Sequence, residues 1–247
     1  MILKKCYMTN NPCYKGTGTD SKVGIVVHST GAPNKTLKRY VQPLTTDSNY
    51  AEVIADIGKN IYGNDWNHTT RQVGVHAFIG ENVNGVVETY QVMPYEKNAW
   101  GVASGSKGSY NYSPTSHIQF EICEDNLADK DYFNRAMTEA IEYCAYLCKL
   151  YGWGADKIVS HAETYKKGYG SNHGDPDHWL KKFGKDMDWF RGEVDKILNP
   201  NAVQEPTKTE VIYRVQVGAY SVQKNAEAML AKLKAAGFDG FIKKEVK

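Results

Sequence analysis

The segment SNHGDPDHW, residues 171–179, places two histidines and two aspartates within nine positions. Imidazole nitrogens and carboxylate oxygens are zinc ligands, and Gly174 and Pro176 favour a defined turn that can aim a carboxylate. A catalytic zinc site takes three protein ligands, so this segment predicts either part of such a site or a polar surface turn. Its four possible donors are His173, Asp175, Asp177 and His178.

Two further histidines end predicted strands. His28 follows the β-branched run VGIVV, and His161 ends the short run DKIVSH. A strand end beside a loop is a common place for an active-site group, although His28 alone is better explained by a hydrogen bond in the core. Two imidazoles and one more ligand would complete a zinc site with an open fourth position. From the residues alone, the third ligand stays open among Asp175, Asp177, His173 and Glu163.

Glu121 lies inside the predicted strand SHIQFEIC, where apolar residues alternate with Gln119 and Glu121. A solvent-facing glutamate is the simple explanation, because Gln119 shares its face. A carboxylate beside an activated water is also what a metallohydrolase uses as general base. Both interpretations stay open from the sequence alone.

The elements that must position these residues alternate between strands and helices. Besides the strands above, GVHAFIG and VVETYQV flank a predicted hairpin turn, ENVNG. Helices are predicted around 50–62, over 131–153 and over 179–198. This order predicts an α/β fold.

Composition changes at residue 199. The stretch 199–210, NPNAVQEPTKTE, predicts a linker between a domain of residues 1–198 and a small module of residues 211–247. The module reads as strand, helix and strand, a β-α-β unit, and carries seven basic and three acidic residues.

Several classes of protein are not expected. A net charge of +2 without a basic stripe argues against a nucleic-acid partner. No apolar run is long enough to insert into a membrane, and the N-terminus lacks the apolar core of a signal peptide, so we expect synthesis in the cytoplasm. Five cysteines suggest reduced thiols, and Cys144 and Cys148 are expected to be buried core residues.

The ordered motifs VGIVVHSTGAP, GVHAFIG, YQVMPYEKNAWG, IQFEIC and SH…HGDPDHW carry a family resemblance. The chain from Val23 to Leu198 resembles the zinc-dependent N-acetylmuramoyl-L-alanine amidases, the class of phage lysozyme-type amidases and peptidoglycan-recognition proteins, and most of all clostridial and clostridial-phage endolysins and autolysins. The resemblance implies a mixed central β-sheet flanked by helices, with a groove above the sheet for a muramyl peptide.

The resemblance also implies a reaction: Zn²⁺-assisted hydrolysis of the amide between N-acetylmuramic acid and L-alanine, in a wall reached after holin- or lysis-dependent release. His173 stands where the family commonly has lysine, and the stretch from His161 to Asp175 is longer than the family pattern. The implied site residues are the zinc ligands His28, His161 and Asp175, the catalytic residues Glu121 and His173, and the substrate-binding residues His76 and Trp100.

The tail, YRVQVGAYSVQKNAEAMLAKLKAAGFDGFIKK, resembles the first half of a sporulation-related repeat (SPOR), which implies a partial peptidoglycan-binding module. Either this module is truncated, or two chains complete one another as a homodimer. Two alternatives to an amidase are a binding-only peptidoglycan-recognition protein on the same fold and an unrelated protein whose histidines are structural. The presence of all three implied ligands favours the amidase.

Overall fold

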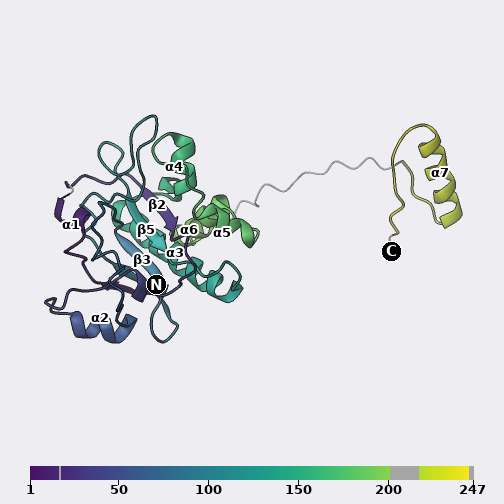
Figure 1. The fold of residues 1–247 in the computed structure, drawn as a ribbon. Coiled ribbons are helices and arrows are strands. Elements are labelled where there is room, and N and C mark those ends of the chain that lie inside the picture. The colour runs from purple at the N-terminus through teal and green to yellow at the C-terminus, as the bar shows by residue number, and fades with distance from the viewer. Residues whose placement is uncertain (17, 201–216, 245–247) are drawn as a thin grey trace. The chain divides into compact units, whose positions relative to one another are not determined.

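A six-stranded sheet with the order β1-β4-β3-β5-β2-β6 forms the centre of the first of two units, Met1–Ala202 and Val203–Lys247. The computed structural model describes residues 1–16, 18–200 and 217–244. Strands β3, β5, β2 and β6 are parallel, whereas β4 is antiparallel to β3, so the sheet is mixed, as predicted. Figure 1 shows the neighbouring strands β3, β5 and β2. The strands are β1 (Leu3–Lys5), β2 (Ile25–Ser29), β3 (Ala77–Glu81), β4 (Val87–Gln91), β5 (Ile118–Ile122) and β6 (Ile158–Ser160).

Helices of this unit differ from prediction in two places. The helix predicted over 50–62 ends at residue 57, because Gly58 has a φ of +83°. The helix predicted over 179–198 is two helices, since Gly184 has a φ of +66° and Asp186 caps a new helix through Trp189 N–H (2.7 Å). The α-helices are α1 (Pro12–Gly16), α2 (Tyr50–Ile57), α3 (Lys130–Tyr151), α4 (His161–Lys167), α5 (Asp177–Lys182) and α6 (Met187–Leu198), and the 3₁₀ helices are η1 (Leu37–Arg39) and η2 (Ala155–Lys157). None of the described helices is both long and apolar enough to traverse a bilayer.

Helix α3 is the main cover of one face of the sheet. Asp129 caps its start by accepting bonds from the N–H groups of Asp131 and Tyr132, and Gly152 ends it in the left-handed conformation. Its apolar side packs with α5 and α6 on side chains from four parallel strands. Both Cys144 and Cys148 are buried there as free thiols, as predicted.

The opposite face of the sheet carries polar side chains. In the parallel pairing of β2 with β5, Val26 lies opposite Gln119 and His28 lies opposite Glu121. Because side chains alternate along a strand, these four share one face, while Ile25, Val27, Ile118 and Phe120 point to the helices. The fold therefore turns His28 and Glu121 away from the main core and toward the loops.

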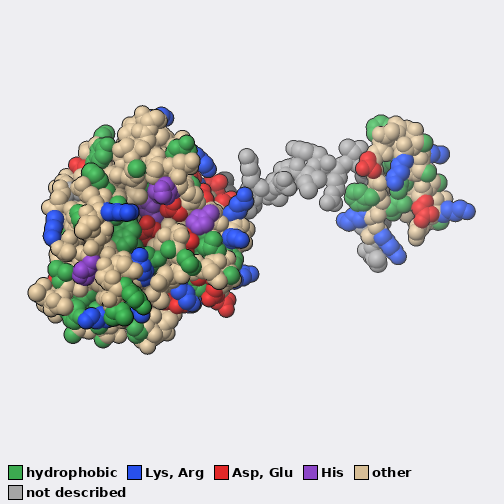
Figure 2. All heavy atoms as spheres, in the orientation of Figure 1, with side chains coloured by type: hydrophobic (Ala, Val, Ile, Leu, Met, Phe, Trp, Pro, Cys, Tyr) green, Lys and Arg blue, Asp and Glu red, His purple; other side chains and the backbone are tan. Residues whose placement is uncertain are grey.

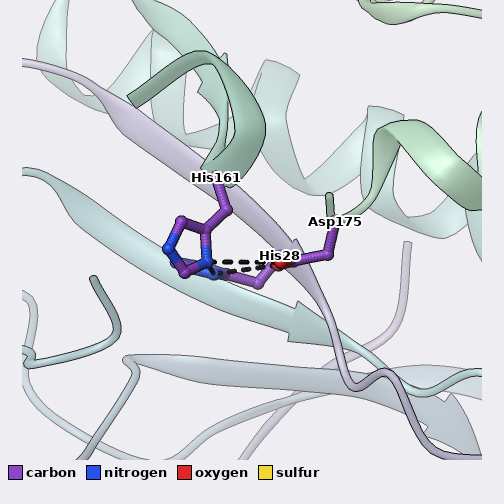
Figure 3. Close-up of side chains that lie close together, drawn as sticks. All are labelled: His28, His161 and Asp175. Carbon is purple, nitrogen blue, oxygen red and sulfur yellow. Dashed lines mark hydrogen bonds and ion pairs between the residues drawn. The ribbon is translucent and has the colours of Figure 1, made fainter. Parts of the chain in front are cut away.

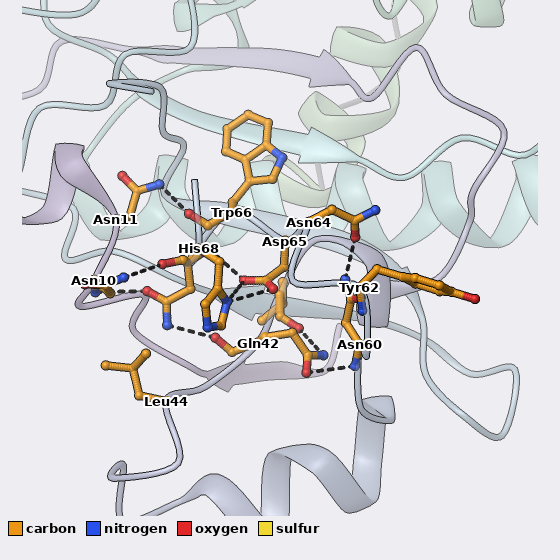
Figure 4. Close-up of polar contacts among 12 residues, drawn as sticks. Asn10, Asn11, Gln42, Leu44, Asn60, Tyr62, Asn64, Asp65, Trp66 and His68 are labelled. Carbon is orange, nitrogen blue, oxygen red and sulfur yellow. Dashed lines mark hydrogen bonds and ion pairs between the residues drawn. The ribbon is translucent and has the colours of Figure 1, made fainter. Parts of the chain in front are cut away.

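Amide side chains brace those loops, holding the segment 58–73 against the N-terminal turn (Figure 4). Asn10 N–H donates to Asn67 Oδ1 (2.9 Å), and the Asn67 amide donates to the Gln42 carbonyl (2.9 Å). Trp66 of this segment packs edge-on against Phe78 of β3, with ring centroids 5.1 Å apart. The network thus anchors an aromatic layer on the same side of the sheet as His28.

The second unit contains one described helix, α7 (Gln223–Ala235), in which no side chain is buried. The strand predicted over 238–244 is not formed there, because a strand needs a partner and the described residues of the unit supply none. Residues 211–216, which include most of the other predicted strand, lie outside the described residues.

Trp179 of α5 offers a test of the main core. Its ring is fully buried against Tyr132 and Phe133, whereas its buried indole N–H has no hydrogen-bond partner in the described part of the chain. We expect Trp179→Ala to lower the free energy of unfolding by about 3–5 kcal/mol through cavity formation. Trp179→Phe is expected to cost less, because it also removes the unpaired donor.

The measurement is chemical denaturation followed by circular dichroism, with Trp100→Ala as control. Trp100 is 38% exposed, so its removal is expected to cost about 1 kcal/mol or less. Equal losses for Trp179→Ala and Trp179→Phe would show that packing volume does not decide stability at this position.

Candidate metal centre

His28, His161 and Asp175 converge, and all three are buried (Figure 3). His28 Nδ1 lies 3.1 Å from His161 Nδ1, and these two nitrogens lie 3.3 Å from Asp175 Oδ2 and Oδ1 respectively. Ligand atoms at tetrahedral corners around zinc, each 2.0–2.1 Å from the ion, would lie about 3.3 Å apart. The donor types and their spacing therefore fit one zinc ion.

His161 is delivered by a helix start. It is the first residue of α4, directly after β6, where Ser160 Oγ accepts from Glu163 N–H (3.1 Å) and Glu163 Oε2 accepts from Ser160 N–H (3.0 Å). This capping box satisfies two backbone donors at the turn that carries His161. Arg191 of α6 donates to both oxygens of Glu163 (2.9 and 3.0 Å), so this carboxylate is a cap and not the third ligand.

The outer nitrogens of both histidines also have partners. His28 Nε2 lies 3.1 Å from Gln119 Oε1, and His161 Nε2 lies 3.1 Å from Ser171 Oγ. The Gln119 amide donates to Asn111 Oδ1 (3.0 Å), which turns its oxygen toward His28. With zinc bound, His28 would carry its proton on Nε2 and present the Nδ1 lone pair to the ion, the arrangement that outer partners impose on metal-binding histidines.

Gly101 makes room for the contact between His28 Nε2 and Gln119 Oε1. A Cβ atom at this position would lie 2.4 Å from Gln119 Oε1 and 3.2 Å from His28 Nε2. Only glycine allows the backbone to approach so closely. The preceding residue, Trp100, is partly exposed beside this packed segment. The roles of Gln119, Ser171 and Gly101 were missed from sequence, although Gln119 shares a face with Glu121 and could have been suspected on that ground.

Glu121 is buried next to His28 in the sheet, so the solvent-facing alternative is wrong. Among the residues that the structure describes, its Oε2 has no hydrogen-bond partner. Burial raises the pKa of this carboxyl to about 8, with His28 opposing the rise and Asp175 and Glu124 adding to it. A carboxyl with such a pKa and a free oxygen is suited to exchange a proton near neutral pH.

The pKa of Asp175 is lowered, whereas that of Glu121 is raised. Burial alone would raise it, but hydrogen bonds from His161 and His28 outweigh burial and hold it well below its usual range. Burial lowers the pKa of His161, whereas for His28 the effect of burial is outweighed by Asp175 and Glu121, so its pKa is raised. The centre therefore keeps an ionised carboxylate between two imidazoles.

His173 lies at the edge of the centre. Its ring stacks on His161 (centroids 4.5 Å apart, planes at 4°), its Nδ1 is 3.7 Å from Asp175 Oδ1, and its side chain is 59% exposed. Histidine and acidic side chains lie next to each other on the surface shown in Figure 2. An exposed imidazole beside the ligands is placed to meet a molecule that approaches from solvent.

His76 and Asp177 lie elsewhere. His76 is fully buried, with Nδ1 accepting from Gln119 N–H (2.9 Å) and Nε2 bonded to the Lys97 carbonyl (2.9 Å). Burial lowers its pKa to about 3, so it is a neutral structural residue, and the predicted direct contact with substrate does not fit this position. Asp177 is outside the cluster and lies against Ser160, and burial raises its pKa.

Comparison with protein families and known proteins gives consistent matches. The family model described as N-acetylmuramoyl-L-alanine amidase matches residues 20–178, and that of the SPOR domain matches residues 188–247. The second match begins within α6, whose Phe190 and Val194 belong to the core of the first unit. A probable N-acetylmuramoyl-L-alanine amidase of Bacillus licheniformis is 28% identical over 132 residues, which is 50% of this chain and 34% of that protein. The chain thus spans about a third of that relative's length.

Two solved structures share the fold. The Staphylococcus aureus hydrolase AmiA, determined in complex with its ligand, is 21% identical with a TM-score of 0.53, over 81% of this chain and 84% of AmiA. The catalytic domain of XlyA is 17% identical with a TM-score of 0.50, over 78% of this chain and 99% of that domain. At these identities the likeness concerns the fold alone.

The raised pKa of Glu121 predicts a pH dependence of stability. The folded pKa of about 8 exceeds the ordinary 4.5, so folding takes up a proton between these values, and this group's contribution to stability is lost as pH rises through the window. In metal-free protein we expect wild type to lose stability relative to Glu121→Gln between about pH 5 and pH 8. Chemical denaturation in the presence of a chelator measures the difference, and parallel pH profiles would contradict the prediction.

Proposed function

The chain belongs to the N-acetylmuramoyl-L-alanine amidase family, and we propose that it hydrolyses the amide between N-acetylmuramic acid and L-alanine with Zn²⁺ held by His28, His161 and Asp175. One observation carries the zinc proposal: two imidazole nitrogens lie 3.1 Å apart, and each lies 3.3 Å from one oxygen of the Asp175 carboxylate. Their outer nitrogens are already held by Gln119 and Ser171, so both rings face inward before any ion binds.

Zinc in this position supplies a Lewis acid for the amide carbonyl and lowers the pKa of water. Glu121, with its unpaired oxygen, accepts the proton of the attacking water and passes it to the leaving amine of L-alanine. His173, at the exposed edge of the metal centre, donates a hydrogen bond to the oxygen of the tetrahedral intermediate. Trp100, partly exposed beside Gly101, contacts the substrate next to the metal centre.

We further propose that the second unit binds peptidoglycan and pairs with a second copy of itself. The SPOR match and the amidase match both point to the cell wall as partner. Large apolar side chains of this unit, Val217, Phe238 and Phe241, are 57%, 65% and 81% exposed, so pairing would remove apolar surface from water. A wall hydrolase of this kind fits the role of an endolysin or autolysin.

Asp175→Ala tests the metal centre. Removing one of three ligands is expected to abolish both stoichiometric zinc and the release of new L-alanine amino termini from purified cell walls. Elemental analysis and amine labelling measure the two quantities on the same samples. Zinc retained in Asp175→Ala would move the third ligand to a neighbour, and a wild type that neither binds zinc nor releases amines would indicate a binding protein.

The matched control is Glu121→Gln, which keeps the shape of the side chain and all three ligands. It is expected to retain zinc while turnover falls about 10²–10⁴-fold, the usual contribution of a general base. Loss of zinc in this variant would mean that Glu121 belongs to the metal centre and not to proton transfer.

Removing the second unit tests its role. A chain of residues 1–202 is expected to bind insoluble peptidoglycan about 10-fold or more weakly, because a linked module raises the effective concentration at the wall. Its hydrolysis of a soluble muramyl peptide should be unchanged. Pull-down with Glu121→Gln versions of both chains avoids digestion during binding, and sedimentation of the full chain reports dimerisation. Equal pull-down of the two chains would exclude the second unit as a wall-binding module.

A further inference from the structure

A second polar cluster lies beside the metal centre. Glu124, which is 3% exposed and follows β5, accepts a bond from Ser29 Oγ (2.5 Å) and pairs with His178 Nε2 (3.1 Å). Its own N–H donates to Thr30 Oγ1 (3.0 Å). Glu124 therefore ties the end of β2, directly after His28, to His178 in the first turn of α5.

His178 has an acceptor at each ring nitrogen. Nε2 faces the Glu124 carboxylate, and Nδ1 lies 3.3 Å from the Gly174 carbonyl. Carbonyl and carboxylate oxygens only accept, so both contacts are hydrogen bonds when the imidazole is protonated on both nitrogens. The Glu124 carboxylate is only 4% exposed, and a hydrogen bond to an ionised acceptor is stronger than one between neutral groups.

The carbonyl that His178 contacts belongs to Gly174, the residue directly before Asp175. The Gly174 carbonyl also accepts the backbone N–H of His178 (2.9 Å), so His178 binds it twice. Residues 172–174 are exposed, and a Cβ atom on Gly174 would meet no atom of the described residues within 4 Å. The chain segment 172–174, which leads to Asp175, therefore has little packing of its own, and hydrogen bonds must fix its position.

We propose that His178 and Glu124 form a clamp that positions Asp175 as a metal ligand, an inference that rests on the proposed zinc centre. One end of the clamp holds Gly174, next to Asp175, and the other is bonded to Ser29, next to His28. It thus fixes the two chain segments that supply two of the three donors. His178 is a positioning residue, because it acts through Gly174 and Glu124.

Electrostatics and positioning predict different results for His178→Ala. Removing a protonated imidazole near the zinc ion would by itself strengthen zinc binding, and removing a neutral one would leave it unchanged. Losing the clamp would weaken it, by about 10-fold at the low end of what outer partners contribute to metal affinity. The sign of the change therefore separates the two effects.

The chain supplies a matched control in His68. Its Nδ1 lies 2.9 Å from the carboxylate of Asp65, and the two side chains are 46% and 1% exposed, so it too is a partly exposed histidine paired with a buried carboxylate. It belongs to the segment 58–73 and supplies no donor to the metal cluster. His68→Ala removes the same chemical group without touching the clamp.

The experiment measures zinc affinity of the full chain by competition with a chromophoric chelator. We expect His178→Ala and Glu124→Gln to bind zinc more weakly than wild type, His68→Ala to match wild type, and the double variant to be no weaker than Glu124→Gln alone. The absorption spectrum of the Co²⁺-loaded protein should change in His178→Ala, because Asp175 shifts. Thermal unfolding of each metal-free variant checks that the fold is kept.

Zinc affinity of His178→Ala equal to or tighter than that of wild type would overturn the clamp while leaving the zinc centre intact. Additive losses in the double variant would also overturn it, since the two residues would then act separately. A wild type without zinc affinity would refute the metal centre itself and the clamp with it.

Discussion

The parallel register between β2 and β5 is the constraint on which the site depends. It sets His28 beside Glu121 and Val26 beside Gln119 on the loop face of the sheet. Because the side-chain period is two, a slip of one residue would carry the polar set of one strand to the helix face. The apolar residues that alternate with them are buried under α3 and α6, and their burial fixes the register. Core packing on one face therefore determines the chemistry available on the other.

The same buried environment shifts the pKa values of two carboxyl groups in opposite directions. Asp175 lies between two imidazoles that donate to it, which lowers its pKa, while Glu121 keeps an oxygen without a partner, and burial raises its pKa to about 8. A carboxylate that stays ionised suits a ligand, and one that exchanges a proton suits a base. The difference follows from hydrogen-bond partners and not from depth, since both side chains are buried.

Sequence reasoning predicted the elements with strong periodicity, such as α3 and the buried strands, and placed His28 and His161 by the rule that strand ends meet loops. It could not choose among the donors of residues 171–179, because that choice depends on how the turn packs against α4. Glu163 stayed open as a ligand, although Ser160 three residues before it is the signature of a capping box. The break at Gly184 and the role of Gly101 depend on tertiary contacts that no local pattern contains.

Within residues 171–179, four polar side chains of similar chemistry occupy different environments, and the environments separate their roles. Asp175 points inward to the two histidines, His173 stacks outside them, Asp177 lies against Ser160, and His178 reaches to Glu124. Trp179, fully buried in the core under α3, fixes the end of the segment. A short loop can thus present one carboxylate to a metal, because Asp177 and His178 are held by other parts of the fold and His173 stacks on the ring of His161.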